Sequence, residues 1–367
     1  AILARNMSIP AVIGVGSKFL SEIKDGDFAI VDGFTGEIFV DPDEKTTAEL
    51  TAKQKADEEK KRLLQTLKGK ENVTKDGKKI NIYANIGSVD NIGAVLLNDA
   101  GGIGLFRSEF LYLENSDFPT EEQQFHAYKR VLESMAGKKV IIRTLDIGAD
   151  KQVDYFGLKK EENPALGYRA IRICLTRPEI FKTQLRALFR ASVYGNLGIM
   201  FPMITSVSEV EKALAMCGEV KAELKEQGIT VSDSVELGIM IETPAAVMTS
   251  DIIAKEVDFF NIGTNDLEQF TFALDRQNPC YDRVSPKNHR ALLRMIKMVC
   301  DNAHSNGIKA GICGEIAGDP TLTEIFLELD VDMLSVVPSR ILPLRKAVRS
   351  ISLKDPKKAE NDLKLFL

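Results

Sequence analysis

Residues 257–276 have the sequence V-D-F-F-N-I-G-T-N-D-L-E-Q-F-T-F-A-L-D-R, in which a short apolar run passes directly into polar residues. Phe259–Ile262 is predicted to be a strand, because aromatic and branched side chains are followed by a glycine. The turn Gly263–Asp266 then offers backbone N–H groups, an amide and a carboxylate, a set that suits a phosphate bound together with a hard cation. The alternative is a plain strand-to-helix turn in which Asn265 or Asp266 caps the next helix.

The same alternation of a short apolar strand and a longer helical stretch repeats from Gly77 to the end of the chain. We expect eight strands, at Ile80–Ile86, Ile103–Phe106, Val140–Leu145, Gly198–Met203, Leu237–Ile241, Phe259–Ile262, Ala310–Cys313 and Met333–Val337. Helical periodicity follows most of them, for example over Glu209–Glu226. Eight such units favour a (β/α)8 TIM-like barrel over a doubly wound sheet. The segment Val153–Tyr194 exceeds one crossover, so we expect an extra helix there.

Two different segments precede the barrel. Residues 1–40 are predicted to be β-rich, with strands at Ile9–Gly14, Asp27–Val31 and Glu37–Val40. They are too few to bury a core, so we interpret them as the remnant of a domain whose front is missing. Residues 41–76 contain good helix formers without an apolar stripe, which favours a linker helix; a mobile charged linker is the alternative. The barrel domain is then residues 77–367.

Composition narrows the class of protein. Of 367 residues, 44% are hydrophobic and 28% charged, and the net charge of −5 comes from interspersed acids and bases. No basic tract indicates a nucleic-acid partner. The apolar runs are too short to span a bilayer and no leader precedes them, so we expect a cytoplasmic protein without membrane insertion. Because the chain begins with Ala1 and not Met, we expect a fragment or a processed chain.

Of the cysteines and histidines, only Cys313 is expected at the predicted site. Five scattered cysteines argue against a disulfide framework and against a zinc site. The histidines His126, His289 and His304 lie in predicted helices among polar neighbours, away from the strand ends. We therefore assign them no catalytic role.

In a barrel of this kind the functional residues lie at the carboxyl ends of the strands. Those positions hold Arg107-Ser108-Glu109, Arg143 to Asp146, Glu242-Thr243-Pro244, Asn265-Asp266 and Cys313-Gly314-Glu315. Cationic, carboxylate and thiol groups from distant parts of the chain are thus expected to meet at one rim.

Three arginines near that rim indicate an anion site. Arg107 and Arg143 end neighbouring strands, and Arg276 follows the sixth strand. Guanidinium groups bind phosphate oxygens in a fixed, often bidentate geometry. Ordinary salt bridges with Glu109 and Asp146 are the alternative for the first two. Three arginines facing inward would repel one another without an anion, so we favour phosphate binding.

Glu242 and Asp266 are expected on adjacent strand ends. They could share a proton, but beside a phosphate we favour Mg²⁺, which takes one or two carboxylates and completes its shell with substrate oxygens and water. Such an ion polarises a substrate oxygen and stabilises a developing enolate. Cys313 follows the seventh strand between glycines. It is either a buried, inert thiol or, near cations, a titrating one that gives or takes a proton.

These residues resemble the phosphoenolpyruvate-binding domain of enzyme I of the bacterial sugar phosphotransferase system. The similarity extends over nearly the whole chain and includes the stretch 257–276. The other matching segments are G-I-G-L-F-R-S-E-F-L (102–111), V-I-I-R-T-L-D-I-G-A-D-K (140–151), N-P-A-L-G-Y-R-A-I-R (163–172), G-I-M-I-E-T-P-A-A-V (238–247) and G-I-C-G-E-I-A-G-D (311–319). Six segments in the family's order make the resemblance specific.

The resemblance implies a role for each rim residue. Phosphoenolpyruvate would be bound by Arg107, Arg143, Arg169, Asn265, Asp266 and Arg276. Of these, Asn265 would contact the phosphate and Arg169 would add positive charge near it. Glu242 and Asp266 would hold Mg²⁺, and Cys313 would protonate the methylene carbon of the enolate as pyruvate forms. The domain is also expected to form a homodimer through the barrel.

The family's phosphoryl acceptor is a histidine on a mobile domain, and it lies just before a segment similar to Ala1–Arg5 and Ile9–Val12. We therefore expect the acceptor histidine to be missing here, together with the helical region that docks the histidine-containing phosphocarrier protein. The chain should bind phosphoenolpyruvate without phosphorylating the carrier unaided. Which sugars the system transports does not follow from the sequence.

Three departures from the family pattern are visible. Asn261 replaces a small hydroxyl residue, Glu268 replaces threonine or an apolar residue, and Met333–Ser339 matches only loosely. Two rival assignments remain at this point. One is the related domain of pyruvate phosphate dikinase or phosphoenolpyruvate synthase, whose motif at the seventh strand differs. The other is a non-catalytic dimerisation or regulatory module.

Overall fold

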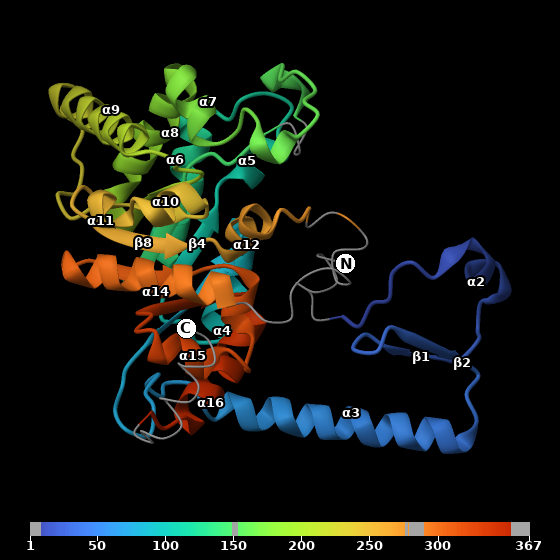
Figure 1. The fold of residues 1–367 in the computed structure, drawn as a ribbon. Helices are drawn as coiled ribbons and strands as arrows, with labels where there is room; N and C mark the ends of the chain where they lie inside the picture. Colours follow the sequence, from blue (N-terminus) through green and yellow to red (C-terminus); the bar gives the residue numbers. More distant parts are fainter. Residues whose placement is uncertain (1–8, 149–152, 276–277, 279–289, 354–367) are drawn as a thin grey trace. The chain divides into compact units, whose positions relative to one another are not determined.

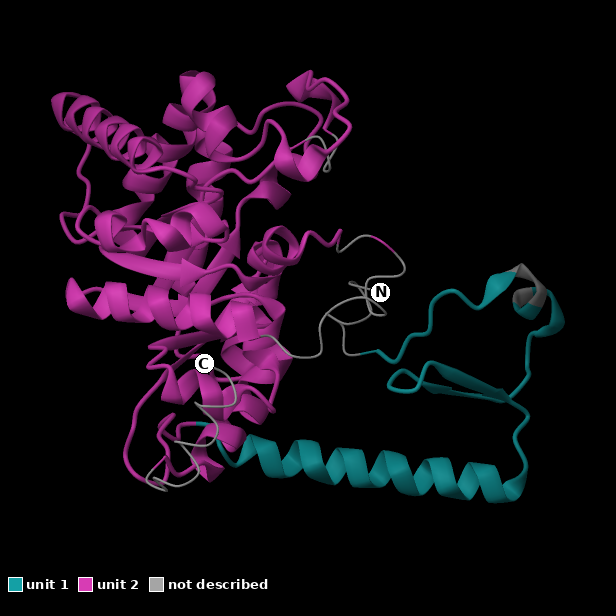
Figure 2. Cartoon of the chain, viewed as in Figure 1, with its two compact units in different colours: residues 1–68 teal, residues 69–367 magenta. Residues whose placement is uncertain are grey.

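The computed structural model describes residues 9–148, 153–275, 278 and 290–353. The chain divides into two compact units, residues 1–68 and residues 69–367, which Figure 2 colours separately. In the described part of the chain, no helix is both long enough and apolar enough to cross a bilayer. The finer division at residues 40 and 76 stays a prediction.

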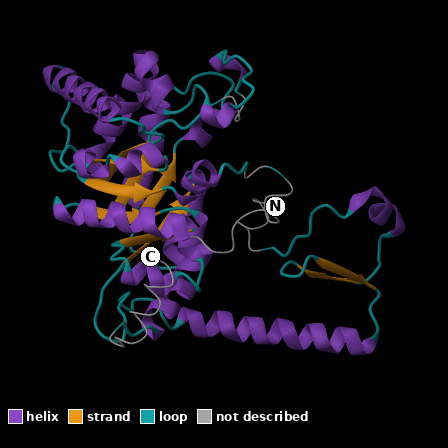
Figure 3. Cartoon of the chain, in the orientation of Figure 1, coloured by secondary structure: helices purple, strands orange, loops and turns teal. Residues whose placement is uncertain are grey.

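Residues 69–367 form a closed barrel of eight parallel strands, drawn in orange in Figure 3. The strands are β3 (Asn81–Ile86), β4 (Ile103–Arg107), β5 (Lys139–Arg143), β6 (Asn196–Phe201), β7 (Glu236–Ile241), β8 (Phe259–Ile262), β9 (Lys309–Ile312) and β10 (Met333–Val336). They pair in chain order, and β10 pairs with β3 to close the ring. The predicted strands and the (β/α)8 barrel are confirmed, with strand ends shifted by at most two residues.

Helices follow most of the strands and cover the outside of the barrel (Figure 1). They are α4 (Ile92–Leu97), α5 (Glu109–Leu113), α6 (Glu121–Ser134), α7 (Ile171–Thr176), α8 (Pro178–Ala191), α9 (Val207–Glu226), α10 (Pro244–Met248), α11 (Ser250–Ile253), α12 (Thr264–Phe272), α14 (Arg290–Ser305), α15 (Thr323–Glu328) and α16 (Ile341–Ser350). The extra helix predicted between Val153 and Tyr194 is confirmed as α7. Helix α9 begins before the predicted Glu209, because Ser206 and Glu209 form a capping box.

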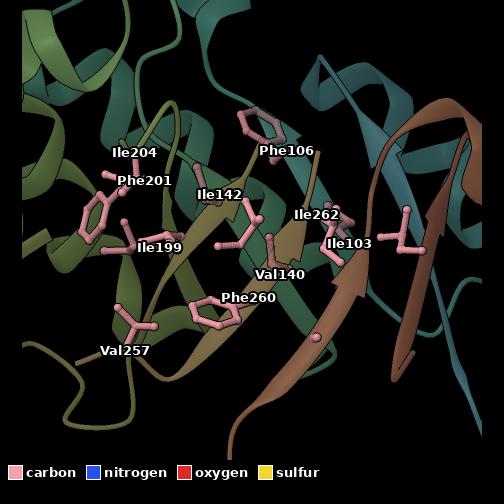
Figure 4. Packing of buried hydrophobic residues seen from close by; sticks show 14 of the residues in the cluster. Ile103, Phe106, Val140, Ile142, Ile199, Phe201, Ile204, Val257, Phe260 and Ile262 are labelled. Carbon is pink, nitrogen blue, oxygen red and sulfur yellow. The ribbon is translucent and has the colours of Figure 1, made fainter. Parts of the chain in front are cut away.

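Both faces of most barrel strands are buried. Consecutive side chains of a strand point to opposite faces, so Ile199 and Phe201 of β6 belong to the layer between strands and helices. Figure 4 shows them among other buried hydrophobic residues, including Phe260. Met200, between them, belongs to a second cluster that consists of Leu105, Ile141, Met200, Met240, Phe259, Cys313 and Met333. Burial on both faces explains why the strands are near-continuous apolar runs in the sequence.

Parallel pairing brings the carboxyl ends of the strands level. Arg107 of β4 pairs with Arg143 of β5. On β7, β8 and β9 the last paired residues are Ile241, Ile262 and Ile312. The next side chains along two of these strands, Glu242 and Cys313, therefore leave the barrel at the same rim as the two arginines.

Residues 1–68 contain helix α2 (Gly16–Glu22), a two-stranded antiparallel sheet of β1 (Ala29–Asp32) and β2 (Glu37–Val40), and helix α3 (Glu44–Gln65). Two predicted strands are confirmed, with the first shifted toward Asp32. The predicted strand Ile9–Gly14 is wrong, because these residues have no regular structure and the side chains of Ile9 and Ile13 are 51% and 72% exposed. Pro10 lacks the N–H that a strand ladder needs.

The predicted linker helix is present as α3. It begins after Asp43, whose side chain accepts a hydrogen bond from the backbone N–H of Thr46 at 2.7 Å. None of its side chains is buried, as expected for a helix without an apolar stripe. The alternative of a mobile charged linker is therefore not supported between Glu44 and Gln65.

Candidate active site

A hollow of about 610 Å³ opens at the carboxyl ends of the strands. The predicted site residues that line it are Arg107, Arg143, Glu242, Asn265, Asp266 and Cys313. Arg169 does not line the hollow but pairs with Asp266, which does. The seventh strand end adds Gly314 and Glu315. Arg276, the third arginine predicted from the sequence, lies outside the described residues.

Arg143 is buried and ion-paired. Its Nη2 lies 2.6 Å from Oε1 of Glu109 and 2.8 Å from Oδ2 of Asp146. Burial disfavours the charged form, but the carboxylates of Asp146 and Glu109 outweigh this and raise the pKa of Arg143 above its ordinary value. The salt-bridge alternative is thus confirmed for Arg143. The same two carboxylates hold its guanidinium rigidly at the wall of the hollow.

Asp146 links two arginines. Its Oδ2 pairs with Arg143, and its Oδ1 accepts a hydrogen bond from Nη2 of Arg169 at 2.8 Å. Nη1 of Arg169 in turn lies 3.4 Å from Oδ1 of Asp266. The result is a continuous buried chain from Glu109 to Asp266 in which cations and anions alternate. Sequence reasoning treated Glu109 and Asp146 only as possible salt-bridge partners and did not expect both to hold one arginine.

Glu242 has a buried carboxylate oxygen that lacks a hydrogen-bond partner. Its carboxyl group is fully buried, Oε1 accepts a hydrogen bond from the backbone N–H of Met203 at 2.6 Å, and Oε2 has no hydrogen-bond partner. Burial and then the neighbouring carboxylates of Asp266 and Asp146 raise the pKa of Glu242. An oxygen in this position favours either a proton or a cation.

The Glu242–Asp266 pair fits Mg²⁺. Both side chains offer hard carboxylate oxygens, and one of those oxygens is buried and without a hydrogen-bond partner. Among the described residues, no group of three or more His, Cys, Asp or Glu side chains could hold a metal by itself. Mg²⁺ is commonly held by one or two carboxylates with substrate and water completing its shell, so two carboxylates suffice.

Backbone strain occurs beside two of these residues. Met203, whose N–H binds Glu242, has φ 57°, and Ala170, which follows Arg169, has φ 53° and ψ −124°. Side chains other than glycine rarely adopt such angles, and each such residue costs about 1–3 kcal/mol. The fold therefore accepts strain where Glu242 and Arg169 are positioned.

The thiol of Cys313 lies at the floor of the hollow. It is buried in the inner cluster, and its Sγ lies 3.6 Å from the backbone oxygen of Ile262. Burial and the carboxylate of Glu242 raise the pKa of Cys313 to about 12, against the opposing effect of Arg143 and Arg107. The thiol is thus protonated at neutral pH, which suits a group that gives a proton in the direction that forms a C–H bond.

Asn265 and Asp266 do not cap helix α12. The N-cap is Gly263, which makes no side-chain cap hydrogen bond, so the capping alternative is wrong. Instead, Oδ1 of Asn265 accepts a hydrogen bond from the backbone N–H of Glu315 at 2.9 Å. This bond connects the start of α12 to the turn after β9. It uses the amide oxygen of Asn265 and leaves the amide nitrogen as a possible donor to a ligand in the hollow.

The charge of the hollow differs from the expectation. Its lining contains two arginines, Arg107 and Arg143, but six carboxylic acids, which are Glu109, Asp146, Glu242, Asp266, Glu268 and Glu315. Arg143 and Arg169 are already neutralised by Glu109, Asp146 and Asp266. The repulsion predicted among Arg107, Arg143 and Arg276 is therefore wrong for Arg143. An anion entering the hollow meets more acids than bases unless a cation accompanies it.

The structure also shows where two of the histidines and Asn261 lie. His126 is exposed on α6, and His304 on α14 lies 2.8 Å from Asp332, so neither lines the hollow. His289 lies outside the described residues. Asn261, a departure from the family pattern, is fully buried and donates to the backbone oxygen of Gly104 at 2.9 Å.

Comparison with known proteins agrees with the geometry. The family model described as "PEP-utilising enzyme, PEP-binding domain" matches residues 61–353, and the model described as "PEP-utilising enzyme, mobile domain" matches residues 1–36. Proteins named phosphoenolpyruvate-protein phosphotransferase are similar over almost the whole chain. Those of Staphylococcus carnosus and Geobacillus stearothermophilus are 47% identical over 352 residues, which is 96% of this chain and 61% of theirs. The chain thus spans about three fifths of the length of these relatives.

Proposed function

Since this chain belongs to the PEP-utilising enzymes and carries their PEP-binding domain, we propose that its hollow binds phosphoenolpyruvate (PEP) with Mg²⁺. The bound PEP would donate its phosphoryl group to a histidine in a part of the full enzyme that precedes this chain, and pyruvate would leave. The relatives' name, phosphoenolpyruvate-protein phosphotransferase, favours this reaction over that of a dikinase.

One observation carries the proposal. Glu242 and Asp266 place carboxylate oxygens, one of them without a hydrogen-bond partner, in the same hollow as Arg107 and Arg143. A dianionic phosphate and a divalent cation satisfy both sets of groups at once. Either ion alone would leave Arg107 or the Oε2 atom of Glu242 without a partner among the described residues.

The arginines act on the phosphoryl group. In a loose transition state the negative charge lies on the equatorial oxygens of the transferring group, and fixed cations stabilise it without having to reorganise. Glu109 and Asp146 hold Arg143 in such a fixed position. Arg107 is only half-buried at the end of β4, and among the described residues no carboxylate forms an ion pair with it, so its charge is available to the ligand.

Glu242 and Asp266 would hold the Mg²⁺ ion, which when bound supplies positive charge for the developing enolate oxygen. Cys313 then gives the proton of its Sγ to the methylene carbon of the enolate, which becomes the methyl group of pyruvate. The resulting thiolate lies near the positive charges of Arg143 and Arg107, which lower its energy until water returns the proton. The homodimer, the phosphocarrier partner and the cytoplasmic location stay predictions.

Calorimetric titration of the chain with PEP tests the proposal, with and without Mg²⁺. We expect heat only with Mg²⁺, because the acids of the hollow repel PEP alone. Arg107→Ala should weaken binding roughly 10- to 100-fold, since a hydrogen bond to a charged group contributes about 1.5–3 kcal/mol. Arg62→Ala, which removes an exposed arginine from α3, is the matched control and should bind as tightly as the unmodified chain.

Arg143→Ala should abolish binding but also leaves Glu109 and Asp146 without their guanidinium. Its melting temperature must therefore be recorded beside its affinity. If the unmodified chain gives no heat with PEP and Mg²⁺, the domain is a non-catalytic module and the proposal fails.

A further inference from the structure

A buried glutamine outside the hollow contacts the segment that carries Arg143. Gln184 lies on α8, is 1% exposed and does not line the hollow. In the sequence it is a polar residue within an amphipathic helix and matches no motif. Its place in the fold is on the outer side of β5, opposite the barrel interior.

Gln184 is connected to the chain on both sides of Thr144, directly on one side and through Ser108 on the other. Its Oε1 accepts a hydrogen bond from the backbone N–H of Leu145 at 2.9 Å. Its Nε2 donates to Oγ of Ser108 at 3.0 Å, and that hydroxyl donates to the backbone oxygen of Arg143 at 2.6 Å. Gln184 thus holds the N–H of Leu145 directly and the carbonyl of Arg143 through the hydroxyl of Ser108.

The position of these bonds matters because the strand pairing stops there. Thr144 is the last residue whose N–H bonds to β6, at the backbone oxygen of Met200. Beyond it the chain continues to Asp146 without a ladder. Gln184 supplies the acceptor for Leu145 at the first position where the neighbouring strand no longer does. It thereby supplies one of the contacts that hold the path from Arg143 to Asp146.

The amide of Gln184 is fully used. Nε2 also donates to the hydroxyl of Tyr128 at 3.1 Å, and that hydroxyl donates to Oε1 of Gln124, again at 3.1 Å. All of these side chains are buried. Buried polar networks that are completely satisfied rigidify their surroundings, and removing one member leaves the others without partners.

We propose that Gln184 is a positioning residue for PEP binding. By holding the segment between Arg143 and Asp146, it sets the direction of the Arg143 guanidinium and the place of Asp146, which in turn holds Arg169. This inference rests on the proposed function, because the ligand whose affinity reports it is PEP. Gln184 itself touches neither ligand nor metal.

Gln184→Met tests the proposal, with Gln124→Met as its matched control. Gln124 is equally buried and belongs to the same network, but it bonds to Tyr112, Tyr128 and Pro119 and not to residues 143–146. Both variants should lose similar thermal stability. We expect Gln184→Met to raise the Kd for PEP in the presence of Mg²⁺ about tenfold, and Gln124→Met to change it less than twofold. Equal affinities of the two variants would overturn the proposal.

Two further measurements separate positioning from general destabilisation. In the background of Arg143→Lys, Gln184→Met should change the Kd less than threefold, because the guanidinium that it positions is gone. Gln184→Glu, which keeps an acceptor for Leu145, should keep most of the affinity. If Gln184→Met does not fold, Ser108→Ala takes its place as the variant expected to lose affinity, because it removes the hydroxyl between Gln184 and the backbone oxygen of Arg143. Additive effects in the double variant would contradict the proposal. Absence of binding by the unmodified chain would instead contradict the proposed function.

Discussion

The protonation state of Cys313 is determined by burial and by charged residues that are distant from it in the sequence. Burial, and then the carboxylate of Glu242, keep the proton on the thiol, and burial with Asp266 and Asp146 raises the pKa of Glu242 in its turn. The hollow, although rich in acids, therefore contains a thiol that keeps its proton at neutral pH and can donate it. A thiol of ordinary pKa in solution would already be partly ionised in mildly alkaline solution.

Cys313→Ala should separate binding from proton transfer. We expect the variant to bind PEP with Mg²⁺ within twofold of the unmodified chain, because the arginines and carboxylates remain. Exchange of the methyl protons of pyruvate for deuterium, followed by NMR, should fall at least 100-fold. General acid catalysis contributes about that much or more. Cys217→Ala, which removes a buried thiol from α9, is the control and should exchange normally.

The pH dependence of this exchange follows from the pKa of Cys313. Because that pKa is raised to about 12, the thiol keeps its proton below pH 12 and donates it equally well at pH 6 and pH 9. Exchange into pyruvate begins in the reverse direction, with removal of a methyl proton by the Cys313 thiolate, whose fraction grows about tenfold per pH unit below the pKa. The exchange rate of the unmodified chain should therefore rise steadily between pH 6 and pH 9. A rate that levels off above about pH 8.5 would mean that the thiol titrates as in solution.

Sequence patterns predicted most of the polar residues that line the hollow, because strand ends in a parallel barrel share one rim. They did not establish that Arg143 pairs with both Glu109 and Asp146, since that depends on side-chain directions across two strand ends. The role of Gln184 could not be predicted from the sequence for a related reason. A glutamine within an amphipathic helix has the same pattern whether it faces solvent or the last N–H of a strand.

The turn between β9 and the short helix after it carries Cys313 into place. The backbone N–H of Cys313 donates to Ile262 at 3.0 Å, and Nδ2 of Asn85 donates to the backbone oxygen of Cys313 at 2.9 Å. Gly314 follows, packed so closely on α12 that an added Cβ would lie 1.8 Å from Oγ1 of Thr264. The element is thus held from β8, β3 and α12 together.

Gly314→Ala should disturb this turn. The added methyl group clashes with the side chain and the backbone nitrogen of Thr264, at 1.8 and 2.8 Å, so either the turn or the start of α12 must move. We expect a loss of about 1–3 kcal/mol in the free energy of unfolding, together with slower deuterium exchange into pyruvate. Chemical denaturation and NMR measure the two effects.

Gly218→Ala is the control for that substitution. Gly218 lies in the middle of α9, and no atom would lie within 4 Å of its added Cβ. Alanine should therefore stabilise the helix by about 0.5–1 kcal/mol and leave exchange unchanged. If both alanine variants behaved alike, close packing at Gly314 would not explain the position of Cys313.

At the scale of elements, the barrel strands could be predicted because strands buried on both faces are continuous apolar runs bounded by polar residues. The same rule misassigned Ile9–Gly14, an apolar run that has no partner strand in the described part of the chain. Helix α2 was missed, since its seven residues contain neither an acidic first turn nor a basic last turn. Short segments outside a core offer little periodicity to recognise.

The whole molecule consists of two units with separate family matches. The PEP-binding model covers residues 61–353, and the mobile-domain model covers residues 1–36. Among the described residues, the two hydrophobic core clusters begin at Ile80 and include none from residues 1–68. A closed barrel also has no open strand edge that needs covering. These features indicate that the barrel does not depend on the first unit for its stability.

We therefore expect residues 69–367 to fold and to bind PEP without residues 1–68. The truncated chain should melt within a few degrees of the full chain in calorimetry, because it keeps every residue of the barrel core. Its Kd for PEP with Mg²⁺ should lie within twofold of the full chain, since all described residues that line the hollow follow residue 100.

Removing residues 69–80 as well is the matched comparison. It takes away Asn72, which accepts a hydrogen bond from Arg345 of α16 at 2.7 Å, and should lower the melting temperature. A truncated chain 69–367 that melts early or fails to bind PEP would show that the first unit contributes to the barrel.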